Sequence, residues 1–357
     1  MKKSFVCLFI IFLSTFAFSK ELKIQRIRFN ETMTYDKNDK FRYSPLKIFD
    51  KKIDTAFAVP QNKTYDNLLL ILHFDKEYDL DEIDICAGYF DTKWYSSNYR
   101  IKEIEFVLNY NEQVSVSKEK FILNDEMKSQ KLYFSETKKV KDIWIKARNL
   151  YPSKAYNDIC ISEMTFKNNG EEYNVVFRPA YYFFGSEYEY DTKGNLIKEK
   201  IRADHDYTEL NYRMIDNKLI GNWEYIDDDG VQKKHDYKTI TYSDNLIEIN
   251  FGQTHIKHYY DNNKIKRSEM KNYLGEIYNI NYYYKNDILD HTDYGEFFYE
   301  NGLLKGYIAY DYCHMDKEKY QIEKINDVFC SYYLEYNDNN QIIKRAVDSW
   351  NGYSGIK

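Results

Sequence analysis

The sequence is poor in the residues that interrupt extended structure. It has 4 prolines and 13 glycines in 357 residues, against 38 tyrosines and 22 phenylalanines. Proline removes a hydrogen bond from a sheet, whereas aromatic rings pack well on half-buried strands. The composition therefore favours a chain built from β-strands. No Cys-x-x-Cys pair occurs either, which argues against a structural zinc site.

Basic residues are also fewer than acidic residues. The chain has 51 lysines and arginines against 57 aspartates and glutamates, a net charge of −6. Binding to a nucleic-acid backbone needs a basic patch that neutralises phosphates. The scattered lysines of this acidic chain provide none, so no nucleic-acid partner is expected.

After residue 19 no apolar run is long enough to span a bilayer, which takes about 20 residues. Residues 1–19 have the features of a secretion signal: Lys2-Lys3, an apolar run over 5–18, and the small residues Ala17 and Ser19 before the cleavage point. An uncleaved anchor is the alternative. Loss of the segment takes the net charge from −6 to −8 and predicts an exported protein, either periplasmic or secreted to the surface of a bacterium.

Catalytic motifs are missing too. The sequence has no Gly-x-Ser-x-Gly elbow, no His-Glu-x-x-His, no phosphate-binding glycine loop and no dinucleotide fingerprint. We therefore expect a protein that is not an enzyme. The alternative is an unrecognised secreted hydrolase with its site between two domains.

Alternating apolar and polar residues mark the strands of the first half. The segments 83–106 and 156–166 alternate with a period close to two, and 68–74 is a continuous apolar run typical of a central strand. Several strands with no strong helix among them predict a β-sandwich over 20–178.

Four short motifs in this half carry a resemblance: Asp54-Thr55-Ala56-Phe57, Ala87-Gly88-Tyr89, Asn98-Tyr99-Arg100-Ile101-Lys102 and the segment from Tyr156 to Met164. Together they resemble the discoidin-like, F5/8 type C-like module known as the translocation or glycan-binding domain of bacterial NAD glycohydrolases. Phe57 stands where that family usually has Trp, and Ala87 where it has Asn. The resemblance, over about 45–166, implies a jelly-roll sandwich of the galactose-binding type and a glycan ligand. It does not imply NAD chemistry, because the catalytic domain of that family is a separate unit.

The loop 88–100 holds more aromatic residues than a turn needs, and a second loop over 149–156 is expected near it. Aromatic faces stack on sugar rings, and loops at one end of a sandwich are common binding sites. The candidate glycan-binding residues are Tyr89, Phe90, Trp94, Tyr95, Asn98, Arg100, Tyr151 and Tyr156. In the alternative, Trp94 or Tyr95 closes the end of the core, while Asn98 and Arg100 hold the loop in place.

The resemblance also implies a structural calcium ion. Its ligands would come from Asp50, Asp54 and Thr55 in one loop and from Glu163 on the last strand. Such oxygen atoms suit calcium. An ordinary turn is the alternative.

Four cysteines remain after Cys7 leaves with the signal. An even number in an exported chain permits disulfides. We expect Cys313–Cys330, and Cys86–Cys160 as a second pair, with buried free thiols as the alternative.

A short pattern recurs through the second half, 179–357. An aromatic residue, a turn of Asn, Asp or Gly, and a Leu or Ile pair follow one another, as in 188–197, 242–247 and 299–304. Such turns between aliphatic and aromatic strands predict hairpins. This half resembles degenerate YD or RHS-type repeats, which implies an open array of antiparallel hairpins. The array would serve as a scaffold or, as in toxin-associated proteins, as a surface for a protein partner.

Overall fold

The computed structural model describes ten stretches of the chain: 20–29, 41–61, 67–109, 117–179, 184–203, 206–216, 218–226, 232–272, 274–313 and 325–347. The predicted secretion signal, 1–19, lies outside the described residues. The regular elements are strands and short 3-10 turns, among them η1 (Pro45–Phe49) and η4 (Tyr95–Ser97). Among these residues no helix is long and apolar enough to cross a bilayer. The prediction of an all-β chain is confirmed.

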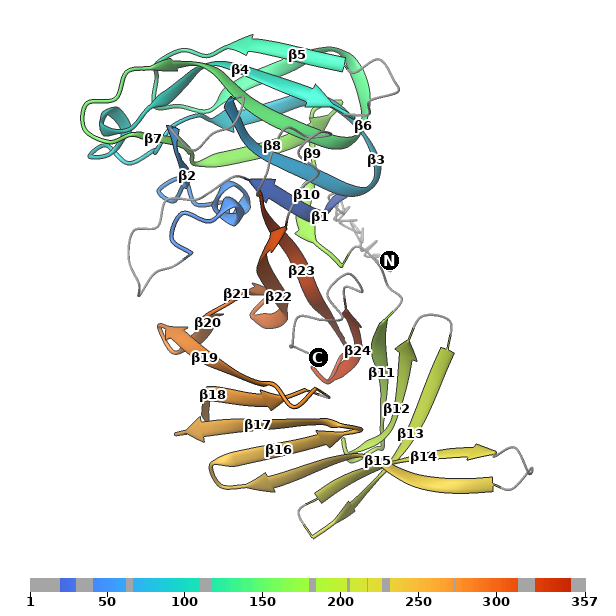
Figure 1. Cartoon of the computed structure of the whole chain (residues 1–357). Coiled ribbons are helices and arrows are strands. Elements are labelled where there is room, and N and C mark those ends of the chain that lie inside the picture. The colour runs from blue at the N-terminus through green and yellow to red at the C-terminus, as the bar shows by residue number, and fades with distance from the viewer. Residues whose placement is uncertain are drawn as a thin grey trace, which may run out of the picture.

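The first half folds into a β-sandwich, in the upper part of Figure 1. Its strands are β1 (Glu21–Phe29), β2 (Phe57–Pro60), β3 (Leu68–Cys86), β4 (Arg100–Leu108), β5 (Ser117–Ile122), β6 (Gln130–Tyr151), β7 (Asp158–Ile161), β8 (Glu163–Asn168), β9 (Glu171–Glu172) and β10 (Asn174–Phe177). The long strands β3 and β6 pair along most of their length, with a register shift between His73 and Tyr78. The first part of β3 also pairs with β1, and its last part with β8. One long strand therefore contributes to both layers.

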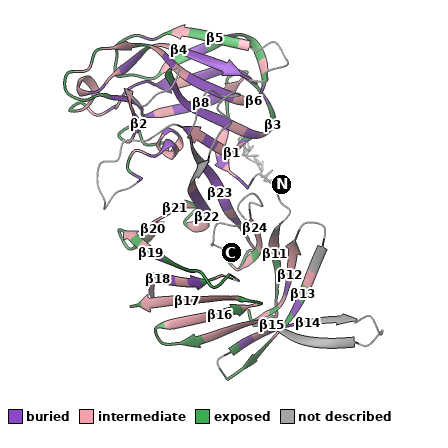
Figure 2. Ribbon diagram, in the orientation of Figure 1, coloured by how far each residue is buried: buried purple, intermediate pink, exposed green. Residues whose placement is uncertain are grey.

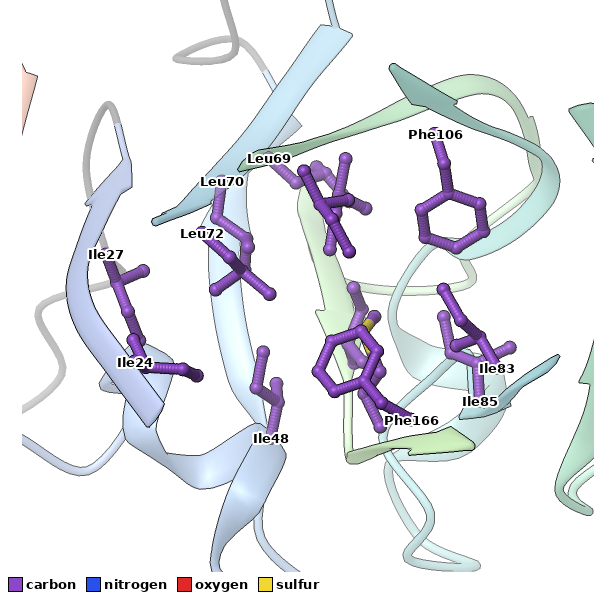
Figure 3. Packing of buried hydrophobic residues seen from close by; sticks show 14 of the residues in the cluster. Ile24, Ile27, Ile48, Leu69, Leu70, Leu72, Ile83, Ile85, Phe106 and Phe166 are labelled. Atoms are coloured by element: carbon purple, nitrogen blue, oxygen red, sulfur yellow. The ribbon is translucent and has the colours of Figure 1, made fainter. Parts of the chain in front are cut away.

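The core lies between these layers. Figure 3 shows Leu69, Leu70 and Leu72 from the start of β3 facing Phe106 of β4 and Phe166 of β8, and all five are fully buried. The run over 68–74 is thus buried on both faces, except at a half-exposed His73. Figure 2 shows that burial is concentrated in this half and in the strands next to it. This packing confirms the predicted sandwich.

The second half is a meander. Its strands are β11 (Phe184–Tyr190), β12 (Leu196–Ala203), β13 (Asp206–Ile215), β14 (Lys218–Ile226), β15 (Gln232–Ser243), β16 (Leu246–Phe251), β17 (Thr254–Asp261), β18 (Lys264–Lys271), β19 (Ile277–Lys285), β20 (Ile288–Thr292), β21 (Gly295–Glu300), β22 (Leu303–Cys313), β23 (Ile325–Tyr336) and β24 (Ile342–Val347). Each strand pairs with the next. Several turns have the positive φ that Asn, Asp and Gly tolerate, for example Asn286 and Asp287 at φ 50° and 64°. The predicted hairpins are present.

The expectation of an open array is wrong. β24 pairs with β11 in antiparallel register, with Phe184 opposite Val347 and Gly185 opposite Ala346. The described strands β11–β24, fourteen in number, therefore close into a barrel. We call this unit the ring; it is the lower part of Figure 1. Closure gives hydrogen-bond partners to the backbone groups of β11 and β24, which would be exposed edge strands in an open array.

Gly185 on β11 permits the close pairing of this strand with β24. A Cβ atom built on Gly185 would lie 2.3 Å from the carbonyl oxygen of Arg345 on β24. No real side chain fits at that distance, so the two strands approach closely only because residue 185 has no side chain.

Strand β1 joins the sandwich and the ring. On one side Ile27 pairs with Leu72 of β3, and on the other with Val328 of β23. The sheet is therefore continuous from one unit into the other, as Figure 1 shows where β23 meets β1.

The part of the chain that the structure describes contains neither predicted disulfide. Cys86 and Cys160 have free, buried thiols, and Cys330 is buried as well. On the β22–β23 ladder Cys313 stands opposite Ile325, whereas Cys330 stands opposite Ile308, five residues away. Five residues of strand span about 16 Å, far beyond the reach of a disulfide.

The second predicted pair is divided between two sheets. Cys86 ends β3, opposite Glu163 of β8, whereas Cys160 lies on β7, opposite Ala58 of β2. Burial raises the pKa of the Cys86 thiol to about 11 and also raises that of Cys160. Both side chains therefore behave as small apolar core residues.

We expect Gly185→Ala to lower the melting temperature by several degrees, because the added methyl group forces β11 and β24 apart. Hydrogen exchange should locate the loss of protection in β24. Glu187→Ala, an exposed position on the same strand, serves as the control and should leave both measurements unchanged. Unaltered protection of β24 in Gly185→Ala would contradict the closure.

Candidate functional site

The loop 88–99 is folded against the end of the sandwich by local bonds. Gly88 has a φ of 153°, and a Cβ atom there would lie 2.8 Å from a ring carbon of Tyr95. The amide groups of Trp94 and Tyr95 both donate to the carbonyl of Asp91, which starts the turn η4. Glycine and this turn allow the loop to fold back closely, and so they fix where Trp94 lies.

A pocket of about 60 Å³ opens beside this loop. It is lined by Arg42, Tyr43, Ala58, Tyr89, Trp94, Asn98, Tyr156, Asp158 and Cys160. These residues come from four parts of the chain: the segment before η1, strand β2, the loop 88–99, and β7 together with the residues just before it. A volume of this size holds a few water molecules or part of a small polar ligand.

Two aromatic residues form the outer edge of the pocket. The rings of Trp94 and Tyr156 have centroids 5.7 Å apart and are tilted by 54°. Tyr156 is 42% exposed, and Trp94 is half-buried with the Lys93 ammonium 4.3 Å from its ring centroid. Both rings are therefore partly open to solvent beside the pocket, where they could stack on an apolar ring surface that carries polar groups.

Polar groups line the inner part of the pocket. Asp158 is only 7% exposed, and burial raises the pKa of its carboxyl. Asn98 is equally buried, and its side-chain amide donates to the carbonyl of Trp94 at 2.9 Å. Burial raises the pKa of Tyr89, while Arg42 beside its hydroxyl opposes that shift. A carboxyl group, an amide and a guanidinium thus meet at the aromatic edge.

The structure brings four of the eight predicted glycan-binding residues to the pocket: Tyr89, Trp94, Asn98 and Tyr156. The other four do not line it. Phe90 is buried against Tyr95, with ring centroids 5.7 Å apart. The hydroxyl of Tyr151 donates to the carbonyl of Leu123 at 2.8 Å.

Arg100 has an internal role. It is 7% exposed, forms an ion pair with Asp125 at 2.7 Å and donates to the carbonyl of Asn98 at 2.9 Å. Its guanidinium also lies 5.6 Å from the ring centroid of Tyr95. Arg100 therefore fastens the loop to the body of the sandwich, as the alternative interpretation of the sequence anticipated.

Sequence reasoning missed Arg42, Tyr43 and Asp158. Asp158 lies in the motif from Tyr156 to Met164, two residues after the predicted binding residue Tyr156. That short separation could have indicated that it belongs to the same site. Nothing in the sequence around Arg42 and Tyr43 indicated the pocket, because they reach it from the other side of the fold.

One of the predicted calcium ligands, Glu163, lines a second hollow of the sandwich, whereas Asp50, Asp54 and Thr55 do not line it. Thr55 donates its hydroxyl to Asp50 at 2.9 Å, and the charge of Asp50 acts on Glu163. One carboxylate oxygen of Glu163, Oε2, is buried without a hydrogen-bond partner in the described structure. Asp54 is exposed. No group of three acidic, His or Cys residues able to hold a metal occurs among the described residues.

The donor set therefore fits a calcium ion only through Asp50, Thr55 and Glu163, with further oxygen atoms needed from the backbone or water. Burial and the nearby charge of Asp50 raise the pKa of Glu163 to about 7. An unpartnered carboxylate oxygen of this kind is the feature that a cation would satisfy.

In the comparison with protein families, the match lies in the first half of the chain. Residues 17–167 match the family model of the NAD glycohydrolase translocation F5/8 type C domain. The match covers β1–β7, nearly all of β8 and the pocket beside the loop 88–99, and confirms the resemblance that the sequence motifs indicated. It ends before the ring, so the expected YD or RHS resemblance of the second half has no support from it. No curated protein matches the chain.

Solved structures resemble the chain only weakly. CpGH89CBM32-5 from Clostridium perfringens, in complex with GalNAc-β-1,3-galactose, has a TM-score of 0.30 and 11% identity over 41% of this chain and 95% of its own. The family 32 CBM of NanJ from C. perfringens, in complex with galactose, has a TM-score of 0.28 and 13% identity over 40% and 98%. An F5/8 type C domain from Bacteroides fragilis has a TM-score of 0.30 and 11% identity over 41% and 95%. At these low scores none of the three carries an argument about function.

The raised pKa of Glu163 predicts a pH dependence of stability. Glu163 in the unfolded chain has a pKa near the ordinary 4.5, against about 7 in the fold. Below pH 4.5 this carboxyl is protonated in both states, so it does not change the free energy of unfolding. Above pH 4.5 it ionises first in the unfolded chain, and the free energy of unfolding falls until the pH has passed about 7. In the presence of a chelator, Glu163→Gln should match the wild type at pH 4 and exceed its stability at pH 8, by roughly 1 to 2 kcal/mol once solvent screening of this partly exposed group is included. Denaturant unfolding at both pH values measures the difference.

Adding calcium at pH 8 provides the matching control. If Glu163 holds the ion, calcium should raise the melting temperature of the wild type but not that of Glu163→Gln. Equal stability of the two proteins at pH 8 under chelation would contradict the raised pKa.

Proposed function

We propose that this chain is an exported, non-catalytic carbohydrate-binding protein that holds a glycan in the pocket between Trp94 and Tyr156. The sandwich over 20–178 is the binding domain, and the ring, β11–β24, is its scaffold. The observation that carries this proposal is the juxtaposition of an aromatic edge with the buried Asp158 and Asn98 in one pocket.

The chemistry of the pocket matches a sugar better than an apolar ligand. A sugar ring has one face of C–H groups and a rim of hydroxyls. The aromatic edge suits the face, and the carboxyl of Asp158 and the guanidinium of Arg42 suit the hydroxyls. The match to an F5/8 type C domain supports the same ligand class.

The absence of a catalytic role is part of the proposal. Its support is the lack of any recognised catalytic motif in the sequence. Export is supported by the features of 1–19 as a secretion signal.

We expect Trp94→Ala to weaken retention on immobilised galactose or GalNAc-β-1,3-galactose several-fold, because one stacked ring contributes on the order of 1 kcal/mol. These two sugars are chosen as probes because they are bound by the Clostridium modules named above. Affinity chromatography and calorimetry of the full chain measure the loss. The melting temperature should change little, because Trp94 is half-buried at the surface.

Tyr133→Ala is the matched control. Tyr133 is 61% exposed on β6 and does not line the pocket, so its removal should leave retention intact. If Trp94→Ala retains the sugar as well as the wild type, the pocket is not the binding site.

Asp158→Asn tests whether the Asp158 carboxyl recognises the sugar, independently of stacking on the aromatic rings. The substitution preserves the shape of the side chain and removes its acceptor-only character. We expect a several-fold weaker affinity for both sugars with an unchanged fold, measured by calorimetry and circular dichroism. An unchanged affinity would exclude Asp158 from recognition.

A further inference from the structure

The segment 41–47 faces the sandwich and the ring at once. It begins with a tight turn, in which the amide of Ser44 donates to the carbonyl of Phe41 at 3.1 Å, and continues into η1. Phe41, Ser44 and Lys47, three residues apart, contact the ring. Arg42 and Tyr43, between them, line the pocket.

Phe41 is anchored in the ring by aromatic packing. Its side chain is 6% exposed. Its ring lies 4.6 Å from that of Tyr310 on β22 and 5.6 Å from that of His291 on β20, measured between centroids. Both partners belong to strands of the ring, so this residue is buried by a unit other than the one that holds the pocket.

Lys47 and Ser44 provide a second, polar attachment. The Lys47 ammonium forms an ion pair with Glu296 of β21 at 3.4 Å, with side chains only 24% and 14% exposed. Glu296 also accepts a bond from the hydroxyl of Tyr310, which interacts with Ser44. One carboxylate thus ties η1 and β22 together.

The other face of the segment shapes the pocket. The ring of Tyr43 lies 6.4 Å from that of Tyr89, edge to face, and both pack against the buried cluster of Ala56, Ala58 and Cys160. Arg42 lies over Tyr43, 5.5 Å from its ring centroid. If this segment moved away, the pocket would lose one wall and Cys160 would lose part of its cover.

We propose that the ring completes the sugar pocket by holding the segment 41–47 in place, with Phe41, Lys47 and Glu296 as positioning residues. Its consequence for glycan affinity rests on the function proposed above. The effect of the ring on the shape of the pocket is independent of that function and can be measured without any sugar. The ring then has a role in binding although it contributes no residue that lines the pocket.

The reactivity of Cys160 reports the shape of the pocket directly. This thiol is 3% exposed and free. Alkylation of the full chain, followed by peptide mass spectrometry, gives a labelling rate for Cys160 alone. We expect Glu296→Ala to raise that rate several-fold, because the substitution releases Lys47 and Tyr310 without altering a residue of the pocket.

Glu335→Ala is the matched control. Glu335 forms an ion pair with Lys344 at 3.5 Å within the ring and does not contact the segment, so its removal should leave the labelling of Cys160 unchanged. Phe41→Leu, which keeps an apolar side chain of similar volume, should label close to the wild-type rate, whereas Phe41→Ser should label several-fold faster.

Binding to immobilised galactose is measured on the same proteins. The proposal predicts that affinity falls several-fold in Glu296→Ala and Phe41→Ser, in parallel with labelling. Equal labelling of Cys160 in Glu296→Ala and the wild type would overturn it, as would equal acceleration in Glu335→Ala. If the wild type itself fails to bind sugar, the proposed function fails, while the labelling still decides whether the ring holds the pocket.

Discussion

Strand β1 is hydrogen-bonded along both of its edges. β3 occupies one edge, while β10 and β23 share the other. A strand with both edges paired cannot shift in register without breaking two ladders, and a shift by one residue would turn Ile24 and Ile27 out of the core. The sandwich and the ring are therefore fixed to each other by backbone bonds, in addition to side-chain contacts such as that of Phe41.

The sequence was sufficient to predict the sandwich, because its signals are local. Alternation over 83–106, the apolar run 68–74 and the final motif each lie within one or two strands, and periodicity detects such features. The turns of the second half were predictable for the same reason, since Asn, Asp and Gly at positive φ belong to the hairpins themselves.

What could not be predicted depends on long-range contacts. Closure of the ring brings Gly185 against Ala346, about 160 residues apart in sequence, and neither residue carries a pattern that names the other. Arg42 and Tyr43 were missed likewise, because they reach the pocket from across the fold. The predicted disulfides failed because cysteine counting ignores register, which separates Cys313 from Cys330 along the ladder.

The closure of the ring also restricts how this protein can change over evolutionary time. In the described strands every neighbouring pair of the ring is antiparallel, including the pair formed by the first and last strands. A meander that closes in this way needs an even number of strands, because an odd number would bring the two ends together in parallel. Single strands can therefore be neither gained nor lost, whereas a whole hairpin can be, and relatives of different length are expected to differ by whole hairpins.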